Sequence, residues 1–501
     1  MEEEENRRRT RSGLVVDSVI VDASDEYDEI QGSVSRRHSV GTWSQRHVVV
    51  FILTFVSYAL FHASRKTLSN VKASLQSAWL PGNASLYPNH SWANSEPLFK
   101  TKKEAADFLG ILDAVFMFAY ATGLYVSGWV GDRLEPRLVL TFGMISSGIT
   151  LFVFGSLTEW LHFYSVPFYL VVYVLFGLAQ ACGWPMEVTV MSRWFGKGHR
   201  GFVLGLWAAC QSAGNILGTY LVSAILFAGY EYAFLLNAAL MLVGGVVIFF
   251  GLVSHPHEVG IYVDEEDEKE EETKHQPISF LTALLLPGVL AYCLSNACLK
   301  LTNYAFFFWL PYYLNNRFEW TEKRADIISI WYDVGAVGGS VLGGLISDWL
   351  GSRTPTIFAM ILASIAALYG YSHATESLLQ NEVLMTVVGA LVGGAYNLIA
   401  ATVAADLGTQ PALAGNEAAL STVTGLIDGT GSFGSGIGQA IIPLIQGSTK
   451  DGWNLVFWLF IAMNGLAALL LVPRLVASLR EKCPPPCCRS EEAEERQPLL
   501  N

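Results

Sequence analysis

Hydrophobic residues recur along this chain in stretches close to the ~20 residues that an α-helix needs to cross a bilayer. An acidic segment divides these stretches six and six, and an even number places both termini on the same side. The pattern therefore predicts an all-α membrane protein with twelve transmembrane helices in two six-helix halves. The stretches lie at about 46–70, 106–129, 138–158, 165–191, 202–228, 232–254, 280–314, 325–350, 355–373, 383–406, 416–446 and 453–475.

The polar segments complete the expected organisation. It comprises a cytosolic acidic tail at 1–45, an N-terminal half at 46–254 with a luminal loop at about 77–104, a cytosolic acidic linker at 255–279, a C-terminal half at 280–475 and a cytosolic tail at 476–501.

Composition supports a lipid environment. Hydrophobic residues make up 52% of the 501 residues and charged residues only 15%, with a mean hydropathy of +0.38. A soluble protein of this size cannot hide so much apolar surface with so few charges. The net charge of −13 resides largely in the polar stretches, and no basic stripe accompanies it. This distribution argues against nucleic acid as a partner.

The loops predict the orientation. Arginine and lysine are moderately more frequent at the helix ends expected in the cytosol, as the positive-inside rule requires. The first outer loop contains two glycosylation sequons, Asn83-Ala-Ser85 and Asn89-His-Ser91. Both fall on the luminal side if the termini are cytosolic, so Asn83 and Asn89 are candidate glycosylation sites.

The sequence contains one literal match to an enzyme motif, and its context argues against that function. Gly429-Thr-Gly431-Ser-Phe-Gly434 matches the dinucleotide-binding fingerprint, but it lies in an apolar segment with no strand before it. We interpret these glycines as helix-packing positions. No metal-ligand cluster and no pairing of nucleophile and base stands out. We therefore expect no catalytic activity, no cofactor and no metal.

The two halves repeat a charged motif at the predicted cytosolic ends of helices two and eight. The first copy, Gly128-x-x-x-Asp132-Arg133-x-x-x-Arg137, corresponds to a second in which Gly344 and Asp348 precede Arg353. An acid and an arginine at neighbouring helix ends suit a gating charge latch, although ordinary topogenic charge is the alternative. Such repetition is typical of a major facilitator transporter, in which two halves rock around a central site.

Two cations in the first hydrophobic stretch need an explanation at membrane depth. The helix from His47 to Ser64 already spans ~27 Å, so Arg65 and Lys66 can reach the luminal interface. Alternatively, residues 67–78 contain no Gly or Pro, so the helix can continue and leave the pair inside the bundle. The sequence leaves both interpretations open.

Lys300 and Asp333, in helices seven and eight, are further candidates. A cation from each half would suit a divalent anion such as a phosphate monoester, and arginine offers a planar fork for two phosphate oxygens. Asp333 is a candidate counter-charge that neutralises Lys66 when the site is empty. Tyr58 and Tyr120 are candidate hydroxyl donors.

Several motifs together resemble the organophosphate:phosphate antiporter family, and within it the eukaryotic sugar-phosphate exchangers of solute carrier family 37. The resemblance covers about 46–475. The motifs include His62-Ala-Ser-Arg-Lys66, Gly183-Trp184-Pro185, Trp194-Phe195, Arg200-Gly201, Trp207, Gly214-Asn215, Tyr230-Glu-Tyr-Ala-Phe234, Phe307-Phe-Trp-Leu-Pro311 and Ile330-Trp-Tyr-Asp-Val334.

The resemblance implies exchange of a phosphorylated sugar or glycerol for inorganic phosphate by alternating access. It implies that Arg65 binds phosphate beside Lys66, that Tyr58 and Tyr120 line the cavity, and that Asp333 stands where the bacterial antiporter has a glutamate. The sequence departs from the bacterial pattern at three positions, one of which is Leu124 in place of a lysine in the second helix. Asn303 replaces a second phosphate-binding arginine, for which Lys300 is a candidate substitute, and Gln211 replaces a histidine.

The last residues resemble an acidic dileucine sorting signal. Glu495, Leu499 and Leu500 match its pattern, which adaptors read at an exposed cytosolic end. We therefore expect a multi-pass endomembrane protein, with the lysosomal membrane favoured and the endoplasmic reticulum as the alternative.

Two other functions remain open. The first is a carrier of a different organic anion, coupled to protons through Asp333 or Glu187. The second is a non-transporting membrane scaffold. The sequence identifies no accessory subunit.

Overall fold

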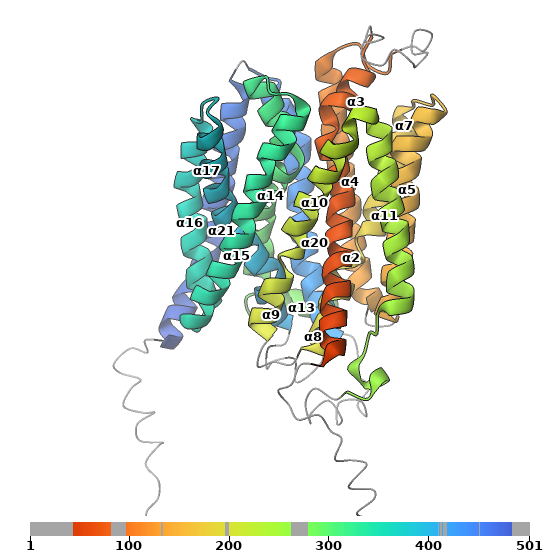
Figure 1. The fold of residues 1–501 in the computed structure, drawn as a ribbon. Coiled ribbons are helices and arrows are strands. Elements are labelled where there is room, and N and C mark those ends of the chain that lie inside the picture. The colour runs from red at the N-terminus through yellow and green to blue at the C-terminus, as the bar shows by residue number, and fades with distance from the viewer. Residues whose placement is uncertain are drawn as a thin grey trace, which may run out of the picture.

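The computed structural model describes residues 44–81, 97–131, 134–195, 200–261, 279–408, 410, 413, 418–449 and 451–482. These residues form helices joined by short connections (Figure 1). The first half contains α2 (Gln45–Asn70), α3 (Lys72–Ala78), α4 (Lys102–Gly131), α5 (Pro136–Leu151), η2 (Phe152–Leu157), α6 (Thr158–Trp160), α7 (Val166–Gln180), α8 (Gly183–Trp194), α9 (Arg200–Trp207), α10 (Cys210–Ile225), η3 (Leu226–Ala228) and α11 (Tyr230–Gly251).

The connection and the second half follow in the same way. They contain η4 (Pro256–Val259), α13 (Phe280–Leu285), α14 (Val289–Phe318), α15 (Glu322–Trp349), α16 (Arg353–Ser372), α17 (Leu378–Val388), η5 (Gly389–Gly393), α18 (Gly394–Asn397), η6 (Leu398–Val403), α19 (Ala404–Gly408), α20 (Ala418–Gln446) and α21 (Gly452–Lys482).

Ten helical segments of the described chain are long and apolar enough to cross a membrane. The other two predicted spans correspond to α14 and α20, which are 30 and 29 residues long. Both helices carry polar residues into the interior, such as Asn296 and Lys300 on α14 and Asp428 on α20, and these lower their hydropathy. The predicted stretch 280–314 is not one helix, since Gly288, at φ +93°, makes a turn between α13 and α14.

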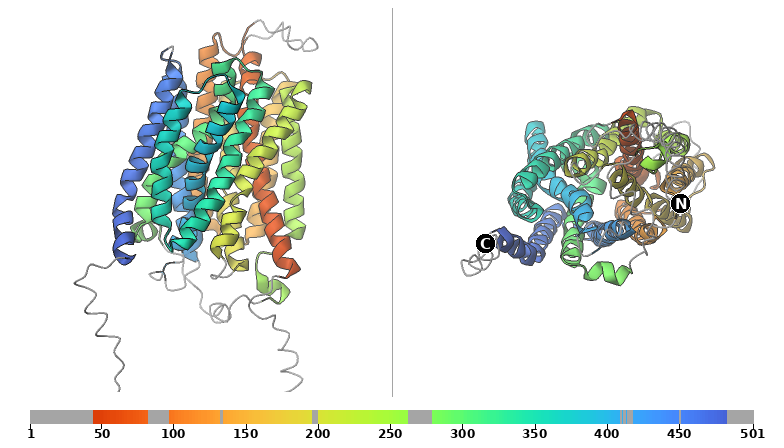
Figure 2. Two further views of the ribbon diagram at one scale, coloured as in Figure 1. Left: turned by 60° about the vertical axis from the view of Figure 1, so that its left-hand side comes forward. Right: turned by 90° about the horizontal axis from the view of Figure 1, so that it is seen from below.

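The helices form one elongated bundle. In Figure 1, α5, α7 and α11 lie at one side and α16, α17 and α21 at the other. Contacts between the halves run along α4 with α20 and along α10 with α15. Helix α2 begins and α21 finishes at the same end, which we call the terminal end (Figures 1 and 2). The opposite end, where α14 finishes and α15 begins, is the far end.

Large apolar side chains cover much of the bundle's exterior. Phe142, Phe250 and Leu469 are 72%, 80% and 65% exposed. A soluble protein rarely exposes so many such residues, whereas lipid would cover them. The interior, in contrast, contains charged and amide side chains, and these form the candidate site.

Candidate functional site

Four cations are buried within the described residues: Arg65, Lys66, Lys72 and Lys300. Two of them have an acidic partner. Lys72 forms an ion pair with Asp113, and the Lys300 Nζ lies 2.6 Å from the Asp428 carboxylate. Arg65 and Lys66 form no ion pair within the described part of the chain. Because an uncompensated buried charge costs several kcal/mol, these two positions need a further explanation.

Helix α2 continues past Arg65 to Asn70, as the absence of Gly and Pro allows. Arg65 is only 1% exposed, so the interior position is the correct interpretation and the interfacial one is wrong. Its Nε donates a 2.6 Å hydrogen bond to Oε1 of Gln180 on α7. The guanidinium carbon lies 4.5 Å from the Tyr120 ring centroid and 5.7 Å from that of Tyr58. Aromatic faces attract a cation without neutralising it.

One guanidinium nitrogen of Arg65 has hydrogen-bonding capacity that the described residues do not use. Nη2 is buried and has no hydrogen-bond partner among the described residues. Buried donors are normally satisfied, and an arginine fork matches two oxygens of a phosphate group. Arg65 is therefore presented with donor capacity free.

A directed chain of hydrogen bonds joins Arg65 to the other half. Arg65 Nη1 lies 3.5 Å from Nε2 of His62, and His62 Nδ1 lies 2.9 Å from the Asn215 side-chain oxygen. Asn215 Nδ2 then donates a 2.6 Å bond to Asp333. Every donor faces an acceptor when His62 is neutral with its proton on Nδ1.

Close helix packing makes this chain possible. Gly214 and Gly218 on α10 face α2, where an added Cβ would lie 2.3 Å from the Ala59 oxygen and 2.7 Å from the Ala63 Cα. The small residues let the two backbones approach. Asn215, next to Gly214, is thereby held against His62.

A proline in α14 determines where Lys66 binds. Pro311 has no N–H, so the carbonyl of Phe307, four residues earlier, receives no helical hydrogen bond. Lys66 Nζ donates to that oxygen at 2.6 Å, and Ser69 Oγ donates to it at 2.8 Å. Lys66 also lies 4.8 Å from the Phe307 ring centroid. These bonds connect α2 to the second half toward the far end.

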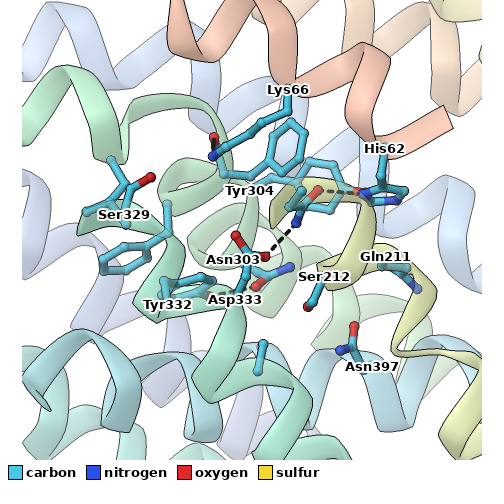
Figure 3. A pocket seen from close by; sticks show the side chains of 16 residues that line it. His62, Lys66, Gln211, Ser212, Asn303, Tyr304, Ser329, Tyr332, Asp333 and Asn397 are labelled. Carbon is cyan, nitrogen blue, oxygen red and sulfur yellow. Dashed lines mark hydrogen bonds between the residues drawn. The ribbon is translucent and has the colours of Figure 1, made fainter. Parts of the chain in front are cut away.

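Lys66, His62 and Asp333 line a narrow cavity between the halves (Figure 3). Amide, hydroxyl and aromatic groups from α10, α14, α15, η5 and α18 complete its wall. The remaining lining residues are Gln211, Ser212, Asn215, Asn303, Tyr304, Phe306, Phe307, Leu310, Ser329, Tyr332, Ala336, Gly393 and Asn397.

The structure separates two residues that the sequence placed together on α14. Asn303 lines the cavity and accepts a 2.6 Å hydrogen bond from the Tyr332 hydroxyl. Lys300 instead contacts α20 through Asp428 and the Ser432 hydroxyl. Its Nζ nevertheless lies 5.5 Å from the Tyr120 ring centroid, so Lys300 and Arg65 converge on one aromatic ring.

The expected neutralisation of Lys66 by Asp333 is not a contact of this structure. Both line the cavity, but no ion pair joins them in the described part of the chain. Asp333 accepts from Asn215, and the Phe307 carbonyl that Pro311 leaves free binds Lys66 instead.

The predicted latch residues are partly described. In the second half, Arg353 forms ion pairs with Asp348 and, at 3.4 Å, with Asp406, which connects α15, α16 and α19. In the first half, the Arg137 Nε lies 3.0 Å from Glu135. Asp132 and Arg133 lie outside the described residues.

Other predicted sites also lie outside the described residues. These are the sequons at Asn83 and Asn89 and the tail residues Glu495, Leu499 and Leu500. The fingerprint-like glycines are described as predicted, within helix α20. A Cβ on Gly431 or Gly434 would lie 2.4 or 2.5 Å from atoms of α14, which identifies them as packing positions.

The sequence does not predict the partners of these groups, and neither Asp428 nor Gln180 stands out from it as a partner of Lys300 or Arg65. His62 carried a detectable signal, because it lies three positions before Arg65 on the same helical face. Contacts between distant helices gave no such signal.

The chain is similar to known proteins along most of its length. The Major Facilitator Superfamily model matches residues 54–438. Sugar phosphate exchanger 3 from Xenopus laevis is 47% identical over 89% of this chain and 95% of the relative. The protein of the same name from Homo sapiens is 46% identical over 87% and 94%. Glucose-6-phosphate exchanger SLC37A2 from Danio rerio is 36% identical over 87% and 93%.

Solved structures agree on the fold. A D-xylose-proton symporter has a TM-score of 0.62 at 13% identity, covering 85% of this chain and 98% of its own. A bacterial homologue of the human lysosomal transporter Spinster, inward-facing and unoccupied, has a TM-score of 0.62 at 14% identity, covering 86% and 97%. At such low identity these likenesses describe the architecture alone.

Proposed function

The chain belongs to the major facilitator superfamily and, within it, to the sugar phosphate exchangers of solute carrier family 37, and from this we propose that it exchanges a phosphorylated sugar or related organophosphate for inorganic phosphate. The family and fold predicted from the sequence are thereby confirmed. Its members are membrane transporters, not enzymes. Transport proceeds by alternating access, as the two halves move around the central cavity.

The observation that supports this proposal best is that Arg65 has no acidic partner in the part of the chain that the structure describes. A buried guanidinium with a free donor is complementary to an anion. Arginine binds two phosphate oxygens through its fork, and Lys66 adds a point charge after leaving the Phe307 carbonyl. The rings of Tyr58 and Tyr120 face the Arg65 guanidinium.

The cavity suits the organic part of the substrate. Gln211, Asn303 and Asn397 offer amide donors and acceptors that match sugar hydroxyls. Tyr304 and Phe307 supply apolar faces. Lys300 contributes less than Arg65, because Asp428 already neutralises it.

The unpaired cation also favours exchange over return of the empty carrier. Reorienting the carrier with an unpaired cation at its centre is costly, so a returning anion lowers the barrier. Hydrogen bonds through His62 and Asn215 link Arg65 indirectly to the Asp333 carboxylate, which does not pair with it directly.

The proposal extends to topology and location. The terminal end faces the cytosol and the far end faces the lumen, where Asn83 and Asn89 carry glycans. The latches at Asp132, Arg133, Arg137, Asp348 and Arg353 gate the cytosolic side. Adaptors that read Glu495, Leu499 and Leu500 deliver the protein to the lysosomal membrane, with the endoplasmic reticulum as the alternative.

Counterflow of labelled phosphate into reconstituted vesicles tests the proposal. Wild type loaded with inorganic phosphate or a hexose phosphate takes up label, whereas Arg65→Ala does not, although it is produced and inserted normally. Arg317→Ala is the matched control, because Arg317 is exposed near the far end of α14 and should not affect exchange. Undiminished counterflow in Arg65→Ala would contradict the site. Wild-type uptake driven by a pH gradient without internal phosphate would indicate a different organic-anion carrier.

A further inference from the structure

Three carboxyl groups follow one face of α15 from the far end toward the cavity. Glu322, Asp326 and Asp333 are separated by four and seven positions, a spacing that aligns them on a helix. Among the residues that the structure describes, each contacts the opposite half through a hydroxyl or amide group and forms no ion pair with a cation. Their hydrogen-bond donors are Ser74, Ser223 and Asn215 respectively.

Asp326 is the most isolated of the three. It is 0% exposed, and its Oδ2 accepts only a long, 3.4 Å bond from the Ser223 hydroxyl on α10. Its Oδ1 has no hydrogen-bond partner, and no ion pair includes it, among the residues that the structure describes. The charged groups that face it are Lys66 on α2, which is occupied by a backbone carbonyl, and the acidic Glu322 on its own helix.

An ionised carboxylate in this position would be costly. Burying a charge without a paired cation and without hydrogen bonds to both oxygens costs several kcal/mol, and such groups take up a proton instead. A protonated Asp326 can remain between α10 and α15 without this penalty. The environment therefore selects the neutral acid whenever the two halves are closed around it.

We propose that Asp326 is a proton-binding site whose occupancy allows the far end of the transporter to close. The proton comes from the solution at the far end and binds to the carboxylate when α10 and α15 separate. Closure then buries the neutral acid against Ser223. Glu322, nearer the far surface on the same face, provides the first acidic group along this route.

The inference rests on the proposed function, because it concerns the closing step of that transport cycle. A lower pH at the far end should therefore accelerate exchange. Since the proposed far side is the lumen of an acidic compartment, the site would favour loading from that side.

The experiment measures phosphate counterflow at equal internal and external pH, from about pH 7.5 to about pH 5.5, in wild type, Asp326→Asn and Asp326→Glu. Inorganic phosphate and phosphate esters also bind their second proton in this range, but this affects all variants alike. Wild type should accelerate several-fold as the pH falls. Asp326→Asn, which mimics the protonated acid, should lose this additional acceleration, and Asp326→Glu should keep it.

Glu376→Gln is the control, because Glu376 is an exposed acid in the loop after α16 at the far end. It should retain the wild-type pH profile. A wild-type profile in Asp326→Asn would overturn the inference, as would identical profiles in all variants. These outcomes leave the proposed function intact, since that fails only if wild type shows no counterflow at any pH or Arg65→Ala retains it.

Discussion

The two paired lysines and the two unpaired cations of α2 show how one bundle treats buried charge in different ways. Lys72 with Asp113 lies within the first half, and Lys300 with Asp428 lies within the second. Arg65 and Lys66 have no acidic partner in the described residues. Lys66 bonds to the second half, whereas Arg65 contacts Gln180, Tyr120 and Tyr58 in the first half. The pairs hold each half together, while the unpaired cations leave charge available to a ligand.

The largest effect is expected from removing the unpaired arginine. Arg65→Ala should reduce exchange by about 100-fold or more, because truncating one partner of a buried charge interaction costs about 2–5 kcal/mol. Its melting temperature in detergent should be equal to that of wild type or higher, since an uncompensated charge is removed. A large loss of stability would place Arg65 with the structural cations and contradict the comparison.

The paired cations should respond in the opposite way. Asp113→Asn leaves Lys72 buried without a counter-charge, which should destabilise the protein by about 3–5 kcal/mol. The double variant Lys72→Met with Asp113→Leu should recover most of that loss. Thermal unfolding of the purified proteins measures both. No difference between the single and double variants would show that the pair is not the relevant interaction.

The second pair tests how far Lys300 participates in binding. Lys300→Met combined with Asp428→Leu removes both charges, so exchange should remain within about tenfold of wild type, or about 1.4 kcal/mol. Counterflow rates compared with those of Arg65→Ala decide the ranking. A loss as large as that of Arg65→Ala would assign Lys300 to the phosphate site despite its ion pair.

The smallest expected effect concerns the carbonyl that binds Lys66. Pro311→Ala restores a backbone N–H that can bond to the Phe307 carbonyl, which then competes with Lys66 and Ser69. One hydrogen bond contributes about 1 kcal/mol, so exchange should change only a few-fold. The apparent affinity for inorganic phosphate should rise, because Lys66 is released. An unchanged affinity would show that Lys66 does not contribute to phosphate binding.

Much of the architecture was predictable because it depends on local pattern. Lipid-facing apolar stretches gave most helices, and the lack of Gly and Pro after Lys66 allowed α2 to continue. The exceptions have physical causes. The hydropathy of α14 is low because it carries buried polar residues such as Asn296 and Lys300, and Gly288 breaks the stretch before it.

The candidate site was predictable only in part. Arg65, Lys66 and Asp333 were found because charge at membrane depth is rare. The partner of Lys300 was not found, since Asp428 is 128 positions away and approaches only because glycines let α20 pack against α14. The role of Asn215 likewise depends on the close approach of α10 to α2.

Whether the unpaired Arg65 binds phosphate is tested most directly by phosphate-dependent thermal stabilisation of the purified protein. The melting temperature is measured with increasing inorganic phosphate, against chloride at equal ionic strength. If the unpaired Arg65 binds phosphate, the melting temperature should rise to a plateau in wild type and in the Lys72→Met/Asp113→Leu variant, and should not rise in Arg65→Ala. An equal rise in Arg65→Ala would show that phosphate binds elsewhere and would contradict the account.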